Sequence, residues 1–322
     1  MGEEAPRRDH LYGGQALIEG VMMRGRDVWA IAVRKADGQI HIESHRIHSI
    51  TERVKLLGKP GFRGIIALGQ ALAIGYRALM VSASESQAEE EKLEGWQMAL
   101  STAFAIFLFV GLFMVLPAFG FGYAERHWIS SGFLANLLEG VVRILLFVGY
   151  IALIGRMQDI HRVFQYHGAE HKTITAYEHE DALTPENIDR YSTLHVRCGT
   201  NFLLITMVIA VLVFAAFGSP GIWWRMASRV VAIPVIAGIA YEALRLGARY
   251  ERSAVMRGLM APGLWLQKIT TAQPDTDQIE VAIASLEAVL EAEAEEGAGE
   301  ELGAEKGTST GEPLDAGLAR DG

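Results

Sequence analysis

Four long apolar stretches constrain this chain more than any other feature of its sequence. They run approximately over residues 96–119, 133–154, 200–217 and 228–246. Each is long enough, or nearly so, to cross ~30 Å of hydrocarbon as a helix. The connectors at 120–132 and 218–227 are short, so we expect the four helices to pair as two transmembrane hairpins, at 96–154 and 200–246.

The overall composition agrees with a membrane protein that is mainly α. Half of the 322 residues are hydrophobic and the mean hydropathy is +0.20, which is too apolar for an ordinary soluble protein of this size. The net charge is −9, but residues 292–322 hold nine acidic and two basic side chains, so they contribute −7 and leave −2 for the rest. We therefore expect a lipid bilayer as partner, and the acidic balance gives no support for nucleic-acid binding.

Lysine and arginine are divided unevenly between the connectors, which predicts how the chain is oriented. Thirteen lie before the first apolar stretch, five in residues 155–199 and five in residues 245–268. The two short connectors carry only Arg126 and Arg225, with Arg229 at the edge of the fourth stretch. The positive-inside rule therefore places the N-terminus, the 155–199 loop and the C-terminus in the cytoplasm of a multi-pass cell-membrane protein. The first residues contain no apolar run, so we expect no cleavable signal peptide.

Residues 62–95 contain a fifth apolar segment of a different kind. Its polar members Arg63, Gln70 and Arg77 recur every seven residues and form one narrow stripe on a helix. A helix that lies flat in the membrane interface, with this stripe toward water, fits that pattern better than a spanning helix. A fifth span would also break the parity of the charge bias. We expect an interfacial amphipathic helix followed by an acidic connector.

The N-terminal part of the chain is expected to be cytosolic and partly β. Residues 1–12 are polar, which predicts a flexible N-terminus. Within residues 13–61, the run Val28–Val33 is apolar and partly β-branched, and Asp37-Gly38 supplies a tight turn before an alternating segment. We expect a small β-rich segment here.

The C-terminal part divides into a folded region and a tail. In residues 247–291, Pro274–Asp277 opens a predicted amphipathic helix. Its apolar face comprises Ile279, Ile283, Leu286 and Leu290. Residues 292–322 contain too few large apolar side chains to fold, so we expect an acidic disordered tail.

The polar loop between the hairpins, residues 155–199, gathers the residues best suited to chemistry. A helix from about Val163 to His179 would carry His167 and His171 one turn apart, 40° from each other around the axis. On the same scale Glu178 lies at 20° and Glu170 at −60° from His167. One side of this helix would therefore present two imidazoles and two carboxylates.

Two neutral imidazoles on one helical face can bind a single divalent metal. His195, Cys198 or Glu178 could complete a tetrahedral site, for which Zn²⁺ is the expected metal. With three protein ligands and one open position, the metal would lower the pKa of a water toward neutrality, and Glu170 could move its proton. If His167, His171, His195 and Cys198 all bind, the site is closed and structural. The non-metal alternative is a solvated helix whose histidines pair with Glu170 and Glu178.

The order His-x-x-Glu-His matches the inverted zinc-protease signature, although that signature also needs a third ligand on a separate downstream helix, which we do not identify. Cys198 is the one cysteine of the chain, so no disulfide can form within it. A reducing compartment or a metal-ligand role fits this cysteine, and an inert buried thiol is the alternative.

A second group of ionisable residues lies inside the predicted spans. Glu139 and Arg143 are four residues apart in the second span, and Glu242 and Arg245 lie toward the cytoplasmic end of the fourth. Ionisable groups in spans are costly and face a partner or a cavity. We favour an intramembrane ion pair that locks the two hairpins together over a polar path for a proton or substrate.

Several long motifs resemble the YqhQ-like family of bacterial membrane proteins. They are Gly13–Gly25 (GGQALIEGVMMRG), Phe164–Lys172 (FQYHGAEHK), His195–Thr200 (HVRCGT) and Gly263–Lys268 (GLWLQK), and the resemblance covers roughly residues 11–291. The family is a domain of unknown function catalogued as predicted metal-dependent enzymes. The resemblance thus implies a metal site in which the motif histidines are His167, His171 and His195, with Glu170 and Cys198 beside them.

Three functions are compatible with these patterns. The leading hypothesis is a metal-dependent hydrolase that acts at the inner membrane face. Its candidate ligands are His167, His171, His195 and Cys198, and its candidate catalytic residue is Glu170. The first alternative is a non-enzymatic membrane assembly or scaffold protein with a closed, structural metal site. The second is a small transporter. The substrate or membrane-protein partner is not identified by the sequence, and assembly of the chain with itself is left open.

Overall fold

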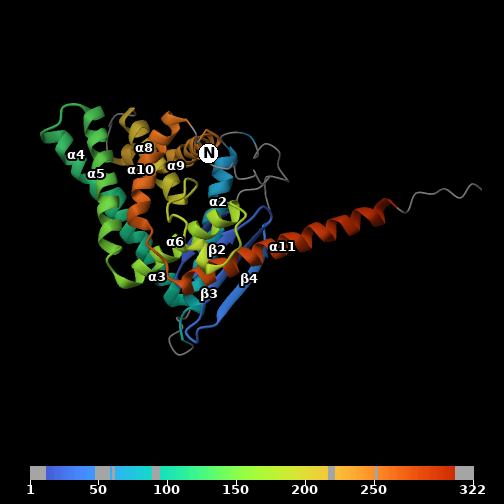
Figure 1. Cartoon of the computed structure of the whole chain (residues 1–322). Coiled ribbons are helices and arrows are strands. Elements are labelled where there is room, and N and C mark those ends of the chain that lie inside the picture. Colours follow the sequence, from blue (N-terminus) through green and yellow to red (C-terminus); the bar gives the residue numbers. More distant parts are fainter. Residues whose placement is uncertain are drawn as a thin grey trace, which may run out of the picture.

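The computed structural model describes residues 12–47, 59, 62–88, 95–216, 222–250 and 253–308. Within them the chain is mainly helical, with a small sheet near its start (Figure 1). The strands are β1 (Gly13–Leu17), β2 (Gly20–Arg24), β3 (Val28–Arg34) and β4 (Ile40–Arg46). The helices of the first half are α2 (Phe62–Glu85), α3 (Gly95–Val110), the π-helical η3 (Gly111–Val115), α4 (Leu116–His127) and α5 (Gly132–Ile154). Those of the second half are α6 (Gln158–Glu178), α7 (Pro185–Ile188), α8 (Gly199–Ala216), α9 (Ile222–Arg249), α10 (Ala254–Thr270) and α11 (Thr276–Thr308).

The four strands form an antiparallel meander in the order β1-β2-β3-β4, which confirms the predicted N-terminal β element. The sheet is covered on both faces, so Val28–Val33 of β3 are all buried. Helices α6 and α11 cover one face, where Val21, Met23, Ala30 and Ala32 join the core. Helix α2 covers the other, where Trp29, Ile31 and Val33 pack with Ala78. This explains why the run is continuously apolar, as expected for a strand buried on both sides.

The turn between β1 and β2 ties the sheet to two helices. Glu19 adopts a left-handed conformation, with φ of 50°. Its carboxylate accepts two hydrogen bonds from the Arg162 guanidinium on α6, at 2.6 and 2.5 Å. On the opposite side, the Ser82 hydroxyl of α2 donates to the backbone oxygen of Ile18. The hairpin tip is therefore fixed between α2 and α6.

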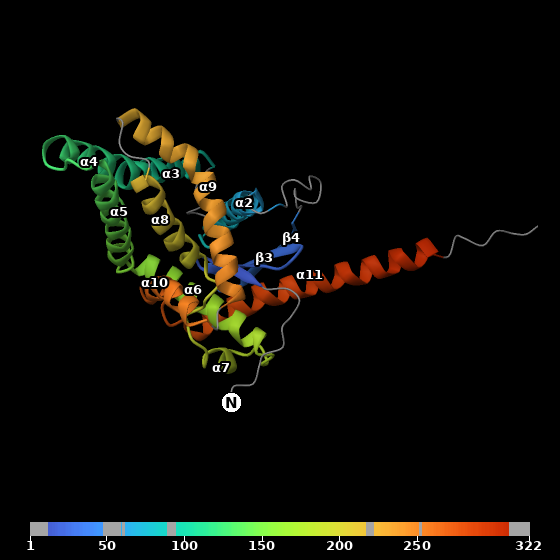
Figure 2. The same ribbon diagram turned by 90° about the horizontal axis from the view of Figure 1, so that it is seen from above.

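In the described part of the chain, five helices are long and apolar enough to cross a membrane. They are Arg63–Glu85, Gly95–His127, Gly132–Ile154, Gly199–Ala216 and Ala227–Gly247. Four of them coincide with the four predicted spans, except that the first continues to His127 through η3 as one long rod (Figure 2). Helix α3 has no buried residue, and Phe107 is 73% exposed. Such apolar surfaces are compatible with a multi-pass membrane protein, because lipid would cover them.

The fifth apolar helix is α2, which the sequence pattern places flat in the interface. The structure gives it protein contacts along its length. The Arg77 guanidinium lies 5.7 Å from the centre of the Trp29 ring, and Arg63 donates to both carboxylate oxygens of Glu242 on α9, at 2.7 and 2.5 Å. Its C-terminal half thus packs on the sheet and its N-terminal half on α9. The interfacial placement of α2 stays a prediction.

A buried ion cluster joins the two hairpins, but its partner on α9 is Arg229 and not Glu242 or Arg245, the residues that the sequence pattern singles out in the fourth span. Glu139 on α5 is fully buried and accepts from Arg143 of the same helix at 2.5 Å. Its second oxygen accepts from Arg229 of α9 at 2.6 Å. Arg143 also donates to the backbone oxygen of Phe113 in η3, at 2.8 Å. A carboxylate shared by two guanidiniums therefore connects η3, α5 and α9.

The C-terminal part contains one helix that the sequence pattern does not predict. Helix α10 includes Pro262, although a proline usually ends or kinks a helix. It packs closely on α8, where a Cβ at Gly263 would collide with the Asn201 side chain.

In α11, Ile279, Ile283 and Leu286 are buried, which confirms the predicted amphipathic face. The helix then continues to Thr308, past the predicted start of the tail at 292 (Figure 1). Its alanine- and glutamate-rich sequence accounts for this difference, because both residues favour helix even without an apolar face. Residues 309–322 lie outside the described part.

The close approach of α6 to the segment after α10 can be tested at a glycine. A Cβ at Gly168 would collide with the backbone oxygen of Ala272, whereas a Cβ at Gly149 of α5 would meet nothing within 4 Å. We expect Gly168→Ala to lower the free energy of unfolding by about 1–3 kcal/mol through overpacking. The matched variant Gly149→Ala should leave it unchanged or raise it by up to about 1 kcal/mol. Thermal unfolding in detergent measures both, and equal effects would contradict the close packing.

Candidate metal centre

Helix α6 brings His167 and His171 together, which confirms that they share one face. Their ring centroids are 4.4 Å apart. The Nδ1 atom of His167 lies 2.8 Å from the backbone oxygen of Thr270, and that of His171 lies 2.5 Å from the backbone oxygen of Thr193. Because a carbonyl oxygen only accepts, each Nδ1 must carry the hydrogen. Each neutral ring therefore presents a lone pair at Nε2, the form in which histidine binds a metal.

Cys198 completes a compact group with the two histidines. One ligating atom from each of His167, His171 and Cys198 lies within 4.8 Å of the other two. The Cys198 Sγ is 3.1 Å from the Nε2 of His167. It also lies 3.2 Å from the hydroxyl of Thr200 and 3.4 Å from its backbone nitrogen. In the part of the chain that the structure describes, these residues form the one group of three or more suited to holding a metal.

The protonation states of this group suit a metal. Burial lowers the pKa of His171, which keeps its ring neutral. Burial acts to raise the pKa of the Cys198 thiol, whereas the hydroxyl and backbone N–H of Thr200 act to lower it. The Nε2 of His171 is buried and has no oxygen or nitrogen partner among the described residues, and the Cys198 side chain is its polar neighbour. A buried polar atom without a partner is costly, and a metal ion would remove that cost.

The donor set fits zinc. Two imidazole nitrogens and a thiolate are typical zinc ligands. Both rings are also oriented by Nδ1–H bonds to backbone oxygens, which is how metal-binding histidines are usually held. The residues present therefore fit a zinc ion bound by three protein atoms.

His195 lies next to this group but outside it. Its ring centroid is 5.6 Å from that of His171, and its Nε2 is 3.7 Å from a carboxylate oxygen of Glu178. Glu178 in turn pairs with Arg197. The backbone of His195 is held by Gln267, whose side chain accepts from its N–H and donates to its carbonyl oxygen, both at 2.8 Å. Two predicted candidates, His195 and Glu178, are thus engaged with each other and with Arg197.

Glu170 lies beside the three-residue group without belonging to it. It is 5% exposed, and burial raises its pKa to about 8. The backbone N–H groups of Gly14 and Ala16, at the outer edge of β1, act in the opposite direction. A Cβ at Gly14 would lie 3.0 Å from the Glu170 side chain, so the glycine makes room for the carboxylate. Its Oε2 has no hydrogen-bond partner among the described residues.

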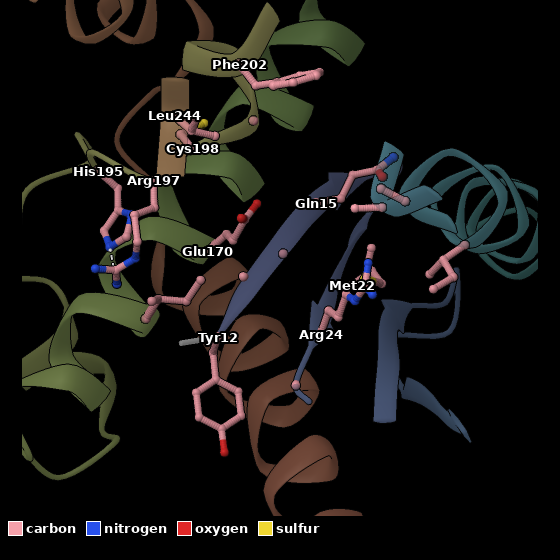
Figure 3. A pocket seen from close by; sticks show the side chains of 18 of the residues that line it. Tyr12, Gln15, Met22, Arg24, Glu170, His195, Arg197, Cys198, Phe202 and Leu244 are labelled. Atoms are coloured by element: carbon pink, nitrogen blue, oxygen red, sulfur yellow. Dashed lines mark hydrogen bonds between the residues drawn. The ribbon is translucent and has the colours of Figure 1, made fainter. Parts of the chain in front are cut away.

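A cavity of about 550 Å³ gives access to these groups. Glu170, His171, His195 and Cys198 all line it. Figure 3 shows Glu170 near the middle, with His195 and Arg197 on one side and Arg24 on the other. An electrophilic or acidic ligand in this cavity would therefore meet a possible base and a possible metal at once.

Some residues of the site are missing from the sequence-based prediction. The carbonyl oxygens of Thr193 and Thr270 carry no sequence signal, because any residue supplies one. Gln267 and Arg24 lie within two of the motifs that resemble the YqhQ-like family. Membership of these motifs is the signal that could have found them.

Comparisons with known proteins agree with the resemblance seen in the sequence. A family model described as "Protein of unknown function (DUF1385)" matches residues 59–292. The chain is also 37% identical, over 295 residues, to the uncharacterized protein YqhQ of Bacillus subtilis (strain 168). The aligned region covers 87% of this chain and 92% of that protein. No solved structure matches the chain. The chain therefore belongs to the YqhQ-like family of unknown function, DUF1385.

Proposed function

We propose that this protein is a metal-dependent hydrolase at a membrane face, with His167, His171 and Cys198 as zinc ligands and Glu170 as the proton carrier. One observation carries the proposal. Among the described residues, the buried Nε2 of His171 has no oxygen or nitrogen partner, and with the neighbouring Cys198 it lies in a group of three ligands that borders a cavity. An oxygen of the Glu170 carboxylate, which has no hydrogen-bond partner in the described part of the chain, belongs to a residue that lines the same cavity.

In the proposed hydrolysis, the zinc ligands and Glu170 have different roles. A zinc ion held here would polarise the substrate and lower the pKa of a water. Glu170 takes a proton from the attacking water and delivers it to the leaving group, so that one water is consumed and one bond is cleaved. Its burial suits this role, because a raised pKa lets a carboxyl group both accept and release a proton near neutral pH. The N–H groups of Gly14 and Ala16 hold the carboxylate in place.

The proposed site faces the cytosol. The charge bias of the connectors supports this orientation, since basic residues gather before the first span, in the 155–199 loop and after the fourth span. The packing of the C-terminal half of α2 on the sheet supports an interfacial position for that helix. With α2 in the interface, the N-terminus, the site and the C-terminus lie on one side.

Each of the two alternative functions requires a feature that can be compared with the structure. A scaffold with a closed metal site needs a fourth protein ligand, and His195 is the candidate. Its engagement with Glu178 favours the open site instead. A transporter needs mobile intramembrane carboxylates, whereas Glu139 and Glu242 are held by arginines.

Metal analysis tests the ligands directly. We expect about one zinc ion per purified chain at neutral pH without chelator. His171→Ala or Cys198→Ala should weaken zinc binding by more than the roughly 10- to 100-fold that loss of an outer hydrogen-bond partner costs. His179→Ala is the matched control, because His179 caps the same helix, is exposed, and has a side chain that bonds the backbone oxygen of Thr175 and packs on Tyr191, away from the three ligands. A wild-type protein without zinc or another transition metal would contradict the proposal.

The variant His195→Ala separates the open site from the closed one. We expect it to keep its zinc, because the Nε2 of His195 faces Glu178 and lies outside the three-ligand group. Zinc content and affinity measured by competition with a chelator check this outcome. A loss as large as that of His171→Ala would favour the structural site of a scaffold.

The variant Glu170→Gln tests the proton carrier, because glutamine keeps the shape but cannot exchange a proton. We expect unchanged zinc content and hydrolysis slowed by roughly 10²–10⁴-fold. Chromogenic esters, amides and phosphoesters serve as probe substrates. Glu178→Gln is the matched control, because it makes the same substitution in the same helix, and it should retain hydrolysis. Equal activity of wild type and Glu170→Gln would rule out the assigned role.

A further inference from the structure

Arg24 is a cation at the cavity with no acidic partner among the residues that the structure describes. It lines the cavity from the end of β2 and is partly buried. Among the described residues it makes no ion pair, and its burial lowers the pKa of its guanidinium. The other two arginines of the cavity differ, since Arg26 lies 3.6 Å from Asp27 and Arg197 pairs with Glu178. A half-buried guanidinium without a counter-ion has lost hydration that an anion could replace.

Apolar side chains also line the cavity. They are Ala67, Leu68, Ala71 and Ile74 of α2, with Phe202 of α8 and Leu244 of α9, which lie near Cys198 in Figure 3. All three helices are long and apolar enough to cross a membrane. The cavity is thus lined both by polar groups, among them Glu170, His171 and Cys198, and by apolar side chains of membrane-type helices.

The first strand separates Arg24 from Glu170 without closing the space between them. In the sheet, Arg24 pairs with Gly13 of β1, and Met22 pairs with Gln15. Residues paired in this way lie on the same face, so Arg24 is on the α2 face of the sheet whereas Glu170 packs at Gly14 from the side of α6. Gly13 and Gly14 have no side chains, so the cavity continues around the edge of β1, as Figure 3 shows by the positions of Glu170 and Arg24.

We propose that the cavity binds an anionic amphiphile, whose acidic group pairs with Arg24 while its apolar chain packs against α2, α8 and α9. This deepens the proposed function by naming the substrate class, and it rests on that function only for the reaction. A guanidinium pairs with both a phosphate and a carboxylate through two parallel hydrogen bonds. A lipid phosphate and a fatty-acid carboxylate therefore share the required chemistry. The cavity volume of about 550 Å³ lies within the range of small-molecule sites.

Binding to the full-length Glu170→Gln protein in neutral detergent tests the proposal without turnover of the probe. The probes are palmitoyl lysophosphatidic acid, palmitate, the neutral amphiphile monopalmitoylglycerol, and glycerol phosphate, which has the acidic group but no chain. We expect one or both anionic amphiphiles to bind about tenfold or more tightly than the two other probes. The stronger of the two identifies phosphate or carboxylate as the acidic group.

Substitution of Arg24 then locates the site. Adding Arg24→Met should weaken binding of the preferred anionic amphiphile by about tenfold or more and leave the neutral one unchanged. Arg26→Met is the matched control, because Arg26 lines the same cavity but is exposed and lies beside Asp27. Thermal unfolding checks that each variant folds. If Arg24→Met does not fold, Arg24→Lys should retain the preference for the anionic probe but bind it less tightly than arginine does.

These binding measurements test the proposal without any measurement of hydrolysis. The proposal would be overturned if the protein bound the anionic and the neutral amphiphiles with equal affinity, or bound glycerol phosphate as tightly as the anionic amphiphiles. It would also be overturned if no probe bound, or if Arg26→Met weakened binding as much as Arg24→Met. Zinc content is measured separately on the same samples. Zinc binding without amphiphile preference would leave the proposed function standing and refute this inference. Amphiphile preference without zinc would do the reverse.

Discussion

Two hydrogen bonds from imidazole to backbone carbonyl determine what this site can do. Thr270 and Thr193 fix the Nδ1–H form of His167 and His171. A proton on Nε2 instead would block the ligand position of each ring. The acceptors come from the end of α10 and from the segment before α8, so the site depends on how these segments pack around α6. Gly168 permits that packing, because α6 meets the Ala272 carbonyl there. The grouping of His167, His171 and Cys198 as candidate ligands is thus a property of the tertiary fold.

The sheet connects this group to the membrane-type helices. Its hairpin tip holds Arg162 of α6 through Glu19 and Ser82 of α2 through the Ile18 carbonyl. Its outer edge directs N–H groups at Glu170. An exposed sheet edge is usually a liability, and here part of that edge positions a carboxylate. The edge strand begins with two glycines, which leave space both for this carboxylate and for the cavity around it.

Periodicity predicted much of the fold and the central part of the site. Apolar length located the four long helices, and the 40° separation of His167 and His171 placed both rings together. The remainder depends on contacts that periodicity does not encode. Glu178 shares the histidine face on a helical wheel, yet Arg197 attracts it and His195 to a separate cluster. Helix α10 was not predicted because proline normally ends a helix, but Pro262 lies inside it. Glu242 pairs with Arg63, which is distant in the sequence, while the nearby Arg245 is exposed.

The π-helical turn η3 behaves as a single inserted residue. Its wider turn frees a backbone oxygen, and that of Phe113 accepts from Arg143. Deletion of one residue from Gly111–Val115 would restore a regular helix, withdraw this acceptor and rotate α3 by about 100° relative to α4. Helix α3 has no buried residue, so its rotation would break few protein contacts. The consequence of the wider turn is therefore an acceptor for a guanidinium at the junction of two hairpins, and the packing of the preceding helix depends on it little.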